Sequence, residues 1–258
     1  MNFIASGLSD VGLQREHNED SFCIVSEHRL FVVADGMGGH RAGDIASRMA
    51  TQEVKAFFDA PDVDGEAWPG DNGVDGAKLT PAQARLVSAV KLANQRIFQA
   101  SLSNRSVQGM GTTIVCALFN RSERKINIAH VGDSRAYRVR DGKLMQLTRD
   151  HSLLNDYLLV MPNLTDAQKE RLPSNVITRA LGMQEAVAVD VVHEAVRPGD
   201  LFVLCSDGLN GMVADERILE IIDDAAGDIE WAARALVSEA NQNGGEDNVT
   251  VVLVQITE

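Results

Sequence analysis

Short apolar runs that end beside a carboxylate constrain this sequence more than any other feature. The runs cover residues 22–25, 30–34, 112–119, 125–131, 136–140, 186–196, 201–206 and 248–256. Their length and their content of β-branched residues are typical of buried strands and too short for membrane spans. Asp141-Gly142 separates two runs by two residues, which predicts a hairpin and therefore antiparallel pairing.

Helical patterns form two pairs that are set apart from the strands. Apolar residues recur every three or four positions in 46–57, 86–97, 214–226 and 228–242. Thr80-Pro81-Ala82-Gln83 has the N-cap, first-turn proline and capping-box glutamine of a helix start. Antiparallel strands with separate helix pairs predict an α+β fold of layered sheets and helices. We expect a single domain over residues 1–258, with a surface loop at 59–80.

Charge and composition exclude several classes of function. The formal net charge of −13 argues against nucleic acid as the partner. The first twenty residues become polar too early for a secretory signal, and no apolar run is long enough to span a membrane. Cys23, Cys116 and Cys205 are far apart within apolar runs, which favours buried reduced thiols over disulfides or zinc. We therefore expect a cytoplasmic protein.

Acidic residues stand at the ends of five of these runs. They are Glu19-Asp20, Asp35-Gly36, Asp133, Asp207-Gly208 and Asp247-Asn248. One aspartate beside a glycine is usually a turn residue, but five such positions predict a shared site. Grouped carboxylates repel one another unless cations neutralise them, and oxygen ligands without histidine or cysteine favour Mg²⁺ or Mn²⁺.

The glycine-rich stretch after Asp35 matches neither common nucleotide motif. "VVADGMGGHRAG" lacks the Gly-Lys-Ser/Thr of a phosphate-binding loop, and the spacing of its glycines does not complete Gly-x-Gly-x-x-Gly. We interpret Asp35 as a carboxylate that bridges metal ions, with the neighbouring glycines allowing backbone and ions to approach closely.

The motifs together resemble a known family. "QREHNEDSF", "VVADGMGGHRAG", "GMGTTIV", "HVGDSRAYR", "TRDHSLL", "ITRALG", "LCSDGL" and "GGEDNVTVV" are similar, in order, to the metal-dependent type 2C Ser/Thr protein phosphatases in their compact bacterial form. The resemblance runs from about residue 10 to residue 252. It implies a β-sandwich of two antiparallel sheets flanked by helix pairs, with a binuclear metal site at one edge.

The resemblance also implies roles for the residues around the first metal-binding motif. Asp35 matches the aspartate that bridges both metals. The Gly36 carbonyl and Glu19 belong with the second metal, and Asp20 orients its waters. Arg15 matches the arginine that binds the phosphate, although a solvated surface charge would be the ordinary interpretation of such a residue.

The later motifs complete the implied metal site. Asp207 and Asp247 hold the first metal, supported by Asn248. Asp133 shares a third, weaker metal with Asp207. The resemblance thus implies two tightly bound Mn²⁺ or Mg²⁺ ions and a weaker third as cofactors. It also implies that a hydroxide bridging the two tight ions would attack phosphorus in line.

One position departs from the pattern of many eukaryotic members. Met37 stands where they have a histidine that is often proposed as the general acid. A metal-bound water is the replacement candidate for protonating the leaving group, and His40 is expected to support the turn.

Alternatives remain at the level of the sequence. "GDSRA" around Ser134 is close to the nucleophile elbow of serine hydrolases, but a hairpin pattern follows it where an elbow requires a helix. A non-catalytic protein on this fold would lack the metal carboxylates, which are all present. A phosphatase for small metabolites stays open. The expected partners are phosphorylated proteins, the substrates of a bacterial Ser/Thr kinase, and we expect a monomer.

Residues 148–182 correspond to the mobile flap of bacterial relatives. Within this flap region, the apolar patch from Tyr157 to Met161 could contact a partner or pack on the domain. Packing is the interpretation that we favour.

Overall fold

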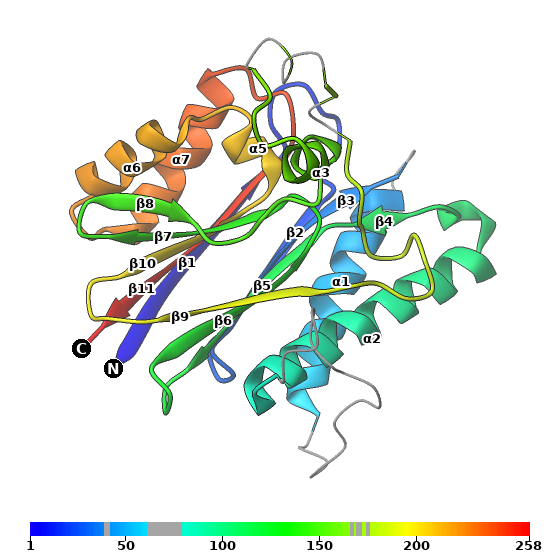
Figure 1. Cartoon of the computed structure of the whole chain (residues 1–258), viewed down its shortest axis with the longest axis horizontal. Coiled ribbons are helices and arrows are strands. Elements are labelled where there is room, and N and C mark those ends of the chain that lie inside the picture. The colour runs from blue at the N-terminus through cyan, green and yellow to red at the C-terminus, as the bar shows by residue number, and fades with distance from the viewer. Residues whose placement is uncertain (39–41, 61–78, 166–167, 169–171, 174–175) are drawn as a thin grey trace.

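Two antiparallel sheets lie face to face between two pairs of helices (Figure 1). The computed structural model describes residues 1–38, 42–60, 79–165, 168, 172–173 and 176–258. One sheet contains, in spatial order, β1 (Asn2–Asp10), β11 (Val249–Thr257), β10 (Leu201–Cys205), β7 (Arg135–Arg140) and β8 (Lys143–Gln146). The other contains β2 (Asp20–Val25), β3 (Leu30–Met37), β5 (Ile114–Asn120), β6 (Lys125–Val131) and β9 (Asp190–Ala195), and β4 (Gly111–Thr112) pairs with β3. The predicted α+β sandwich is confirmed.

Strand β3 shows why the apolar runs are continuous and do not alternate with polar residues. Phe31 and Val33 belong to the core between the two sheets. Leu30, Val32 and Ala34 belong to the core between this sheet and helices α1 (Ala42–Asp59) and α2 (Pro81–Ser103). Successive side chains of a strand point to opposite faces, and here both faces are buried, so every position from 30 to 34 is apolar.

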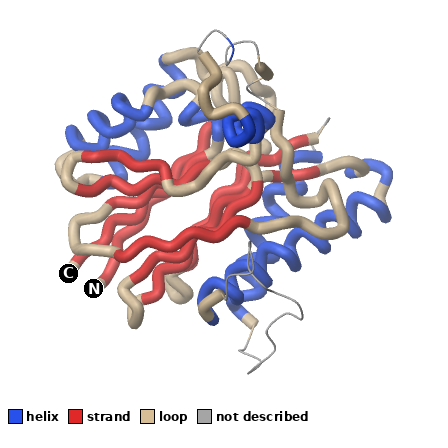
Figure 2. Tube along the Cα trace, in the orientation of Figure 1, coloured by secondary structure: helices blue, strands red, loops and turns tan. Residues whose placement is uncertain are grey.

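The helix pairs cover the outer faces of the sandwich (Figure 2). Thr80 caps α2 as predicted, because its hydroxyl accepts a hydrogen bond from the Gln83 amide while the Gln83 side chain accepts one from the Thr80 amide. On the other face, α6 (Asp215–Asp224) and α7 (Ile229–Gln242) pack on β7, β10 and β11. Asp228 caps α7 by accepting from the Trp231 amide at 2.9 Å.

The β7–β8 turn is the one that the sequence predicts, whereas strand β1 was not predicted. Asp141 and Gly142 both have left-handed φ angles, 52° and 66°, and close the β7–β8 hairpin. Strand β1 pairs with β11 along its full length, although residues 2–10 carry few strong apolar signals. Most of the predicted 59–80 loop, and His40, lie outside the described residues.

The flap region contains α3 (Leu153–Val160), which Ser152 caps by accepting from the Asn155 amide. The interpretation that residues 157–161 pack on the domain is wrong. Leu159 is 62% and Val160 80% exposed, and α3 buries none of its residues.

Two further short helices, η2 (Arg105–Val107) and α5 (Asp207–Asn210), lie before β4 and after β10.

Candidate metal centre

The ends of the central strands bring the predicted carboxylates together at one edge of the sandwich. Asp20 and Asp35 are partners across the β2–β3 ladder. Asp207 begins α5 directly after β10, Asp247 lies just before β11, and Asp133 lies between β6 and β7. The pKa values of Asp20, Asp35, Asp133 and Asp207 are each raised in part by the charge of another member of this group. Segments far apart in the sequence therefore form one acidic cluster, which comprises these five aspartates and Glu19.

Asp35 lies at the centre of the acidic cluster. Burial, followed by the charges of Asp20 and Asp207, raises its pKa well above the ordinary value. The close approach of the Asp35 and Asp207 carboxyl groups raises the pKa of Asp35 further. The pKa of Asp207 is also raised, first by burial and then by Asp247. Both shifts oppose the charged form of these carboxyl groups, and a bound cation would favour it.

One carboxylate oxygen of Asp20 has a hydrogen-bond partner and the other has none. Its Oδ2 accepts a hydrogen bond of 2.7 Å from the Ser206 hydroxyl, and the nearby Thr250 side chain, like Ser206, lowers its pKa. Its Oδ1 is buried without any hydrogen-bond partner. Burial raises the pKa of Asp20 to about 7 although these two side chains oppose the shift. Burying this oxygen without a hydrogen-bond partner costs free energy, and a bound cation would remove that cost.

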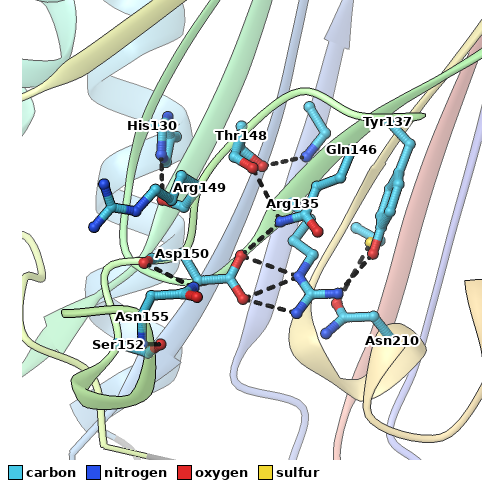
Figure 3. A network of polar contacts seen from close by, with 12 residues as sticks. His130, Arg135, Tyr137, Gln146, Thr148, Arg149, Asp150, Ser152, Asn155 and Asn210 are labelled. Carbon is cyan, nitrogen blue, oxygen red and sulfur yellow. Dashed lines mark hydrogen bonds and ion pairs between the residues drawn. The ribbon is translucent and has the colours of Figure 1, made fainter. Parts of the chain in front are cut away.

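Asp133 is buried beside Asp207, and its Oδ1 also lacks a hydrogen-bond partner. Burial, followed by the charge of Asp207, raises the pKa of Asp133 to about 7. The nearby Arg135 does not satisfy this carboxylate. Its guanidinium instead donates to both oxygens of Asp150, at 2.7 to 3.1 Å, and to the Tyr137 hydroxyl at 2.8 Å (Figure 3). Asp133 therefore keeps an oxygen available for another ligand.

Glu19 lies against the start of α1. A Cβ atom on Gly43 would be 2.8 Å from the Glu19 carboxyl group, and one on Gly36 would be 2.0 Å from the Gly43 carbonyl oxygen. Only glycine allows these backbones to approach so closely. Burial raises the pKa of Glu19, and Asp44 raises it further. Asp44 was not among the predicted residues, because nothing in the sequence shows that the first turn of α1 faces Glu19.

Arg15 and Asn248 border the acidic cluster near Glu19 and Asp247. The Arg15 guanidinium donates to Asp247 at 2.6 Å, and its side chain is 52% exposed. The Asn248 carbonyl oxygen accepts from the Glu19 amide at 2.7 Å, and its amide group donates to the Val11 and His17 carbonyls at 2.9 Å. Asn248 thus fastens the segment that carries Arg15 and Glu19 to the start of β11.

The acidic cluster fits divalent cations. Asp20, Asp133 and Asp207 each have a buried Oδ1 without a hydrogen-bond partner. Carboxylate oxygens without soft ligands suit Mg²⁺ or Mn²⁺. Raised pKa values show that these groups resist ionisation until a positive charge arrives. The burial, the unpaired oxygens and the donor chemistry all point to the same ligand.

A second group of possible ligands contains His130, His151 and Asp190. In the described part of the chain, only this group brings three ligand atoms within 4.8 Å of one another. It is a poor metal site, because the His151 Nδ1 already accepts a hydrogen bond from Gly132 and Arg179 lies 3.2 Å from Nε2. No three residues of the acidic cluster, all of which the structure describes, bring their carboxylate oxygens within 4.8 Å of one another. This wider spacing suits carboxylates that are shared between several ions.

A sandwich with buried carboxylates at one edge agrees with the metal-dependent phosphatases that the sequence motifs resemble. Residues 14–239 match the family model of protein phosphatase 2C. The chain belongs to this family, and the family predicted from the motifs is confirmed.

Proteins similar to this chain are named as phosphatases. A serine/threonine phosphatase of Listeria monocytogenes is 35% identical over 257 residues, covering 96% of this chain and 93% of the relative. Protein phosphatase PhpP of Streptococcus pneumoniae is 35% identical over 258 residues, covering 97% and 96%. The crystal structure of the catalytic domain of the phosphatase PstP with two manganese ions has a TM-score of 0.82, 32% identity and 99% coverage of both chains.

Proposed function

We propose that this chain removes phosphate from phosphoserine and phosphothreonine in proteins, with Mn²⁺ or Mg²⁺ as cofactor. The observation that carries the proposal is the acidic cluster, with its buried unpaired oxygens and raised pKa values. Membership of the protein phosphatase 2C family supports protein substrates over small metabolites. The names of the similar proteins support the same choice.

The proposed ligand roles follow the positions of the side chains. Asp35, at the centre of the cluster, would bridge two ions, and Asp207 with Asp247 would complete the first ion's ligands. Glu19 and the Gly36 carbonyl belong with the second ion, because Gly36 lies against the Glu19 backbone.

Two further aspartates have more peripheral roles in this proposal. Asp20, held by Ser206, would orient water near the second ion. Asp133 and Asp207 influence each other's charge, which supports a weaker third cation between them. Few protein ligands would leave that ion largely hydrated and weakly bound.

The chemistry of the site is direct hydrolysis. Bound divalent cations supply activation of water near neutral pH and neutralise charge on the phosphoryl group. Arg15 is exposed enough to meet a substrate and would hold the phosphoryl oxygens, after exchanging its bond to Asp247. Met37 ends β3 and offers no acid at this position.

The serine-hydrolase alternative does not fit the structure. Ser134 is buried, and its hydroxyl shares a 2.7 Å hydrogen bond with Thr113. The chain continues from Ser134 into strand β7 and not into a helix, so the nucleophile elbow is absent at this serine. We interpret Ser134 as a residue that fixes the turn beside Asp133.

The cellular setting is also part of the proposal. We propose a single domain over residues 1–258 that acts as a monomer in the cytoplasm of a bacterium, opposing a Ser/Thr kinase. Among the described residues, none of the helices is both long and apolar enough to cross a membrane. The negative net charge of −13 supports the absence of a nucleic-acid partner.

The test compares hydrolysis of a phosphothreonine peptide and p-nitrophenyl phosphate across a Mn²⁺ titration. Activity should require the metal and disappear in excess EDTA. Asp35→Asn should abolish turnover and weaken tight Mn²⁺ binding. Asp59→Asn, at the far end of α1, removes a carboxylate about 25 Å along the helix and serves as the matched control. Full activity in EDTA, or in Asp35→Asn with normal metal binding, would contradict the proposal.

A further inference from the structure

His151 holds the residue that precedes Asp133 through two hydrogen bonds. The Gly132 amide donates to the His151 Nδ1 at 3.0 Å, and the His151 amide donates to the Gly132 carbonyl at 2.9 Å. Gly132 has a left-handed φ of 105°, and a Cβ atom there would be 2.6 Å from the Cβ of Thr113. Both the amide and the carbonyl of Gly132 are therefore held by His151. Asp133 is the next residue in the chain, so the position of its backbone depends on these two hydrogen bonds.

Neighbouring side chains fix the tautomer and the plane of the His151 ring. Because Nδ1 accepts from an amide, the neutral ring carries its proton on Nε2, which lies 3.2 Å from an oxygen of Asp190. The other Asp190 oxygen accepts from Arg179 at 2.8 Å. His151 stacks on His130 with ring centroids 4.8 Å apart. The His130 ring in turn donates to the Arg149 carbonyl, as Figure 3 shows.

The same residue joins the two ends of the flap region. The Thr178 amide donates to the His151 carbonyl at 2.8 Å, and the Leu153 amide donates to the Val176 carbonyl at 2.9 Å. Ser152 and Ile177 form an antiparallel bridge between these bonds. His151 thus contacts the turn of Asp133 on one side, and on the other it lies where residues 151–153 and 176–178 pair at the base of the flap region.

We propose that His151 is a positioning residue that fixes the Asp133 carboxylate through Gly132 and thereby sets the affinity of the weak third cation. This inference rests on the proposed function, in which Asp133 and Asp207 bind that cation. Groups that orient a metal ligand without touching the metal typically change metal affinity or activity by about 10- to 100-fold. A buried acceptor for the Gly132 amide is what His151 supplies.

Two substitutions at His151 distinguish the loss of the hydrogen bond to Gly132 from the loss of side-chain packing. In His151→Asn the side-chain oxygen can occupy the place of Nδ1 and accept from Gly132. In His151→Gln the side-chain amide reaches the place of Nε2 and can contact Asp190, but leaves the Gly132 amide without its acceptor. Both variants lose the ring and its stacking on His130, so they share the cost of lost packing.

The experiment measures Mn²⁺ binding to the metal-free protein, by electron paramagnetic resonance of free Mn²⁺, together with hydrogen exchange of the Gly132 amide. Asp133→Asn identifies which Mn²⁺ site is the weak one. We expect His151→Gln to weaken that site by about 10- to 100-fold and to speed Gly132 exchange, with the tight sites unchanged. His151→Asn should stay within about 3-fold of the unaltered protein in both measurements.

Different outcomes identify different failures. Equal weak-site affinities in the two His151 variants, or an unchanged Gly132 exchange rate in His151→Gln, would overturn the positioning role. Loss of the tight sites in both variants would show a general structural role instead. If Asp133→Asn removes no Mn²⁺ site, the third cation of the proposed function is contradicted. The positioning role of His151 would then be contradicted as well.

Discussion

Replacing Asp133 by asparagine should stabilise the metal-free protein at alkaline pH. The Asp133 carboxylate is buried, and its Oδ1 has no hydrogen-bond partner in the structure. Asparagine has nearly the same shape but cannot ionise. The substitution therefore removes the cost of a buried charge while leaving the volume of the site unchanged.

The size and the pH dependence of this gain follow from the pKa of Asp133. Burial raises that pKa from 3.8 to about 7. A carboxylate whose folded-state pKa is raised contributes stability that is fully present below the unfolded pKa and is lost as pH rises through the folded pKa. The cost of ionisation is therefore small near pH 4 and reaches about 4 kcal/mol by pH 8.

Urea unfolding in EDTA between pH 4.5 and pH 8.5 measures this difference. The free energy of unfolding of Asp133→Asn should exceed that of the unaltered protein by an amount that grows with pH and levels off above pH 7. With an m-value of about 3 kcal/mol/M, a gain of 4 kcal/mol moves the midpoint by roughly 1 M. Saturating Mn²⁺ should cancel or reverse the gain, because the unaltered carboxylate then pairs with a cation.

A difference that stays constant with pH would refute this reasoning, since it would show that Asp133 does not titrate between pH 4 and pH 8. A variant that is less stable at every pH would favour the simpler interpretation of Asp133 as a turn residue that bonds nearby backbone amides.

Three further predictions concern the working site. Asp133→Asn should lower turnover more on a phosphothreonine peptide than on p-nitrophenyl phosphate, whose leaving group departs with little help; equal losses would remove this leaving-group argument. Gly43→Ala should weaken Mn²⁺ binding, because the new Cβ meets both the Glu19 carboxyl group and the Gly36 backbone carbon, each at 2.8 Å; unchanged binding by calorimetry would place Glu19 outside the centre. Ser134→Ala should keep most turnover and lose about 1 kcal/mol of stability with the Thr113 hydrogen bond; a collapse in rate without unfolding would revive the serine-hydrolase alternative.

Much of the fold could be predicted because its signals are local. The capping box at Thr80, the Asp141-Gly142 hairpin and the apolar β3 each depend on residues close together in the sequence. Strand β1 was missed because it lies at the edge of its sheet and is mostly half-exposed, so its residues need not be strongly apolar.

The flap helix shows a different limit. The patch at 157–161 is apolar, and apolar side chains are normally expected to pack. In the structure α3 leaves them exposed. Hydrophobicity alone does not say whether a neighbouring element will cover a face.

The members of the acidic cluster could be predicted, whereas their supports could not. Asp35 and Asp207 stand at recognisable strand ends. Asp44, Thr250 and His151 reach the site only through the tertiary fold, by contacts with Glu19, Asp20 and Gly132. Spacing within one sequence carries no signal for such contacts.

Anomalous diffraction at the manganese absorption edge, from crystals grown with Mn²⁺, tests the central claim most directly. We expect two strong peaks a few ångströms apart, both bound by the Asp35 carboxylate, and a weaker third peak between Asp133 and Asp207. A single strong peak, or strong peaks that Asp35 does not ligate, would contradict the account.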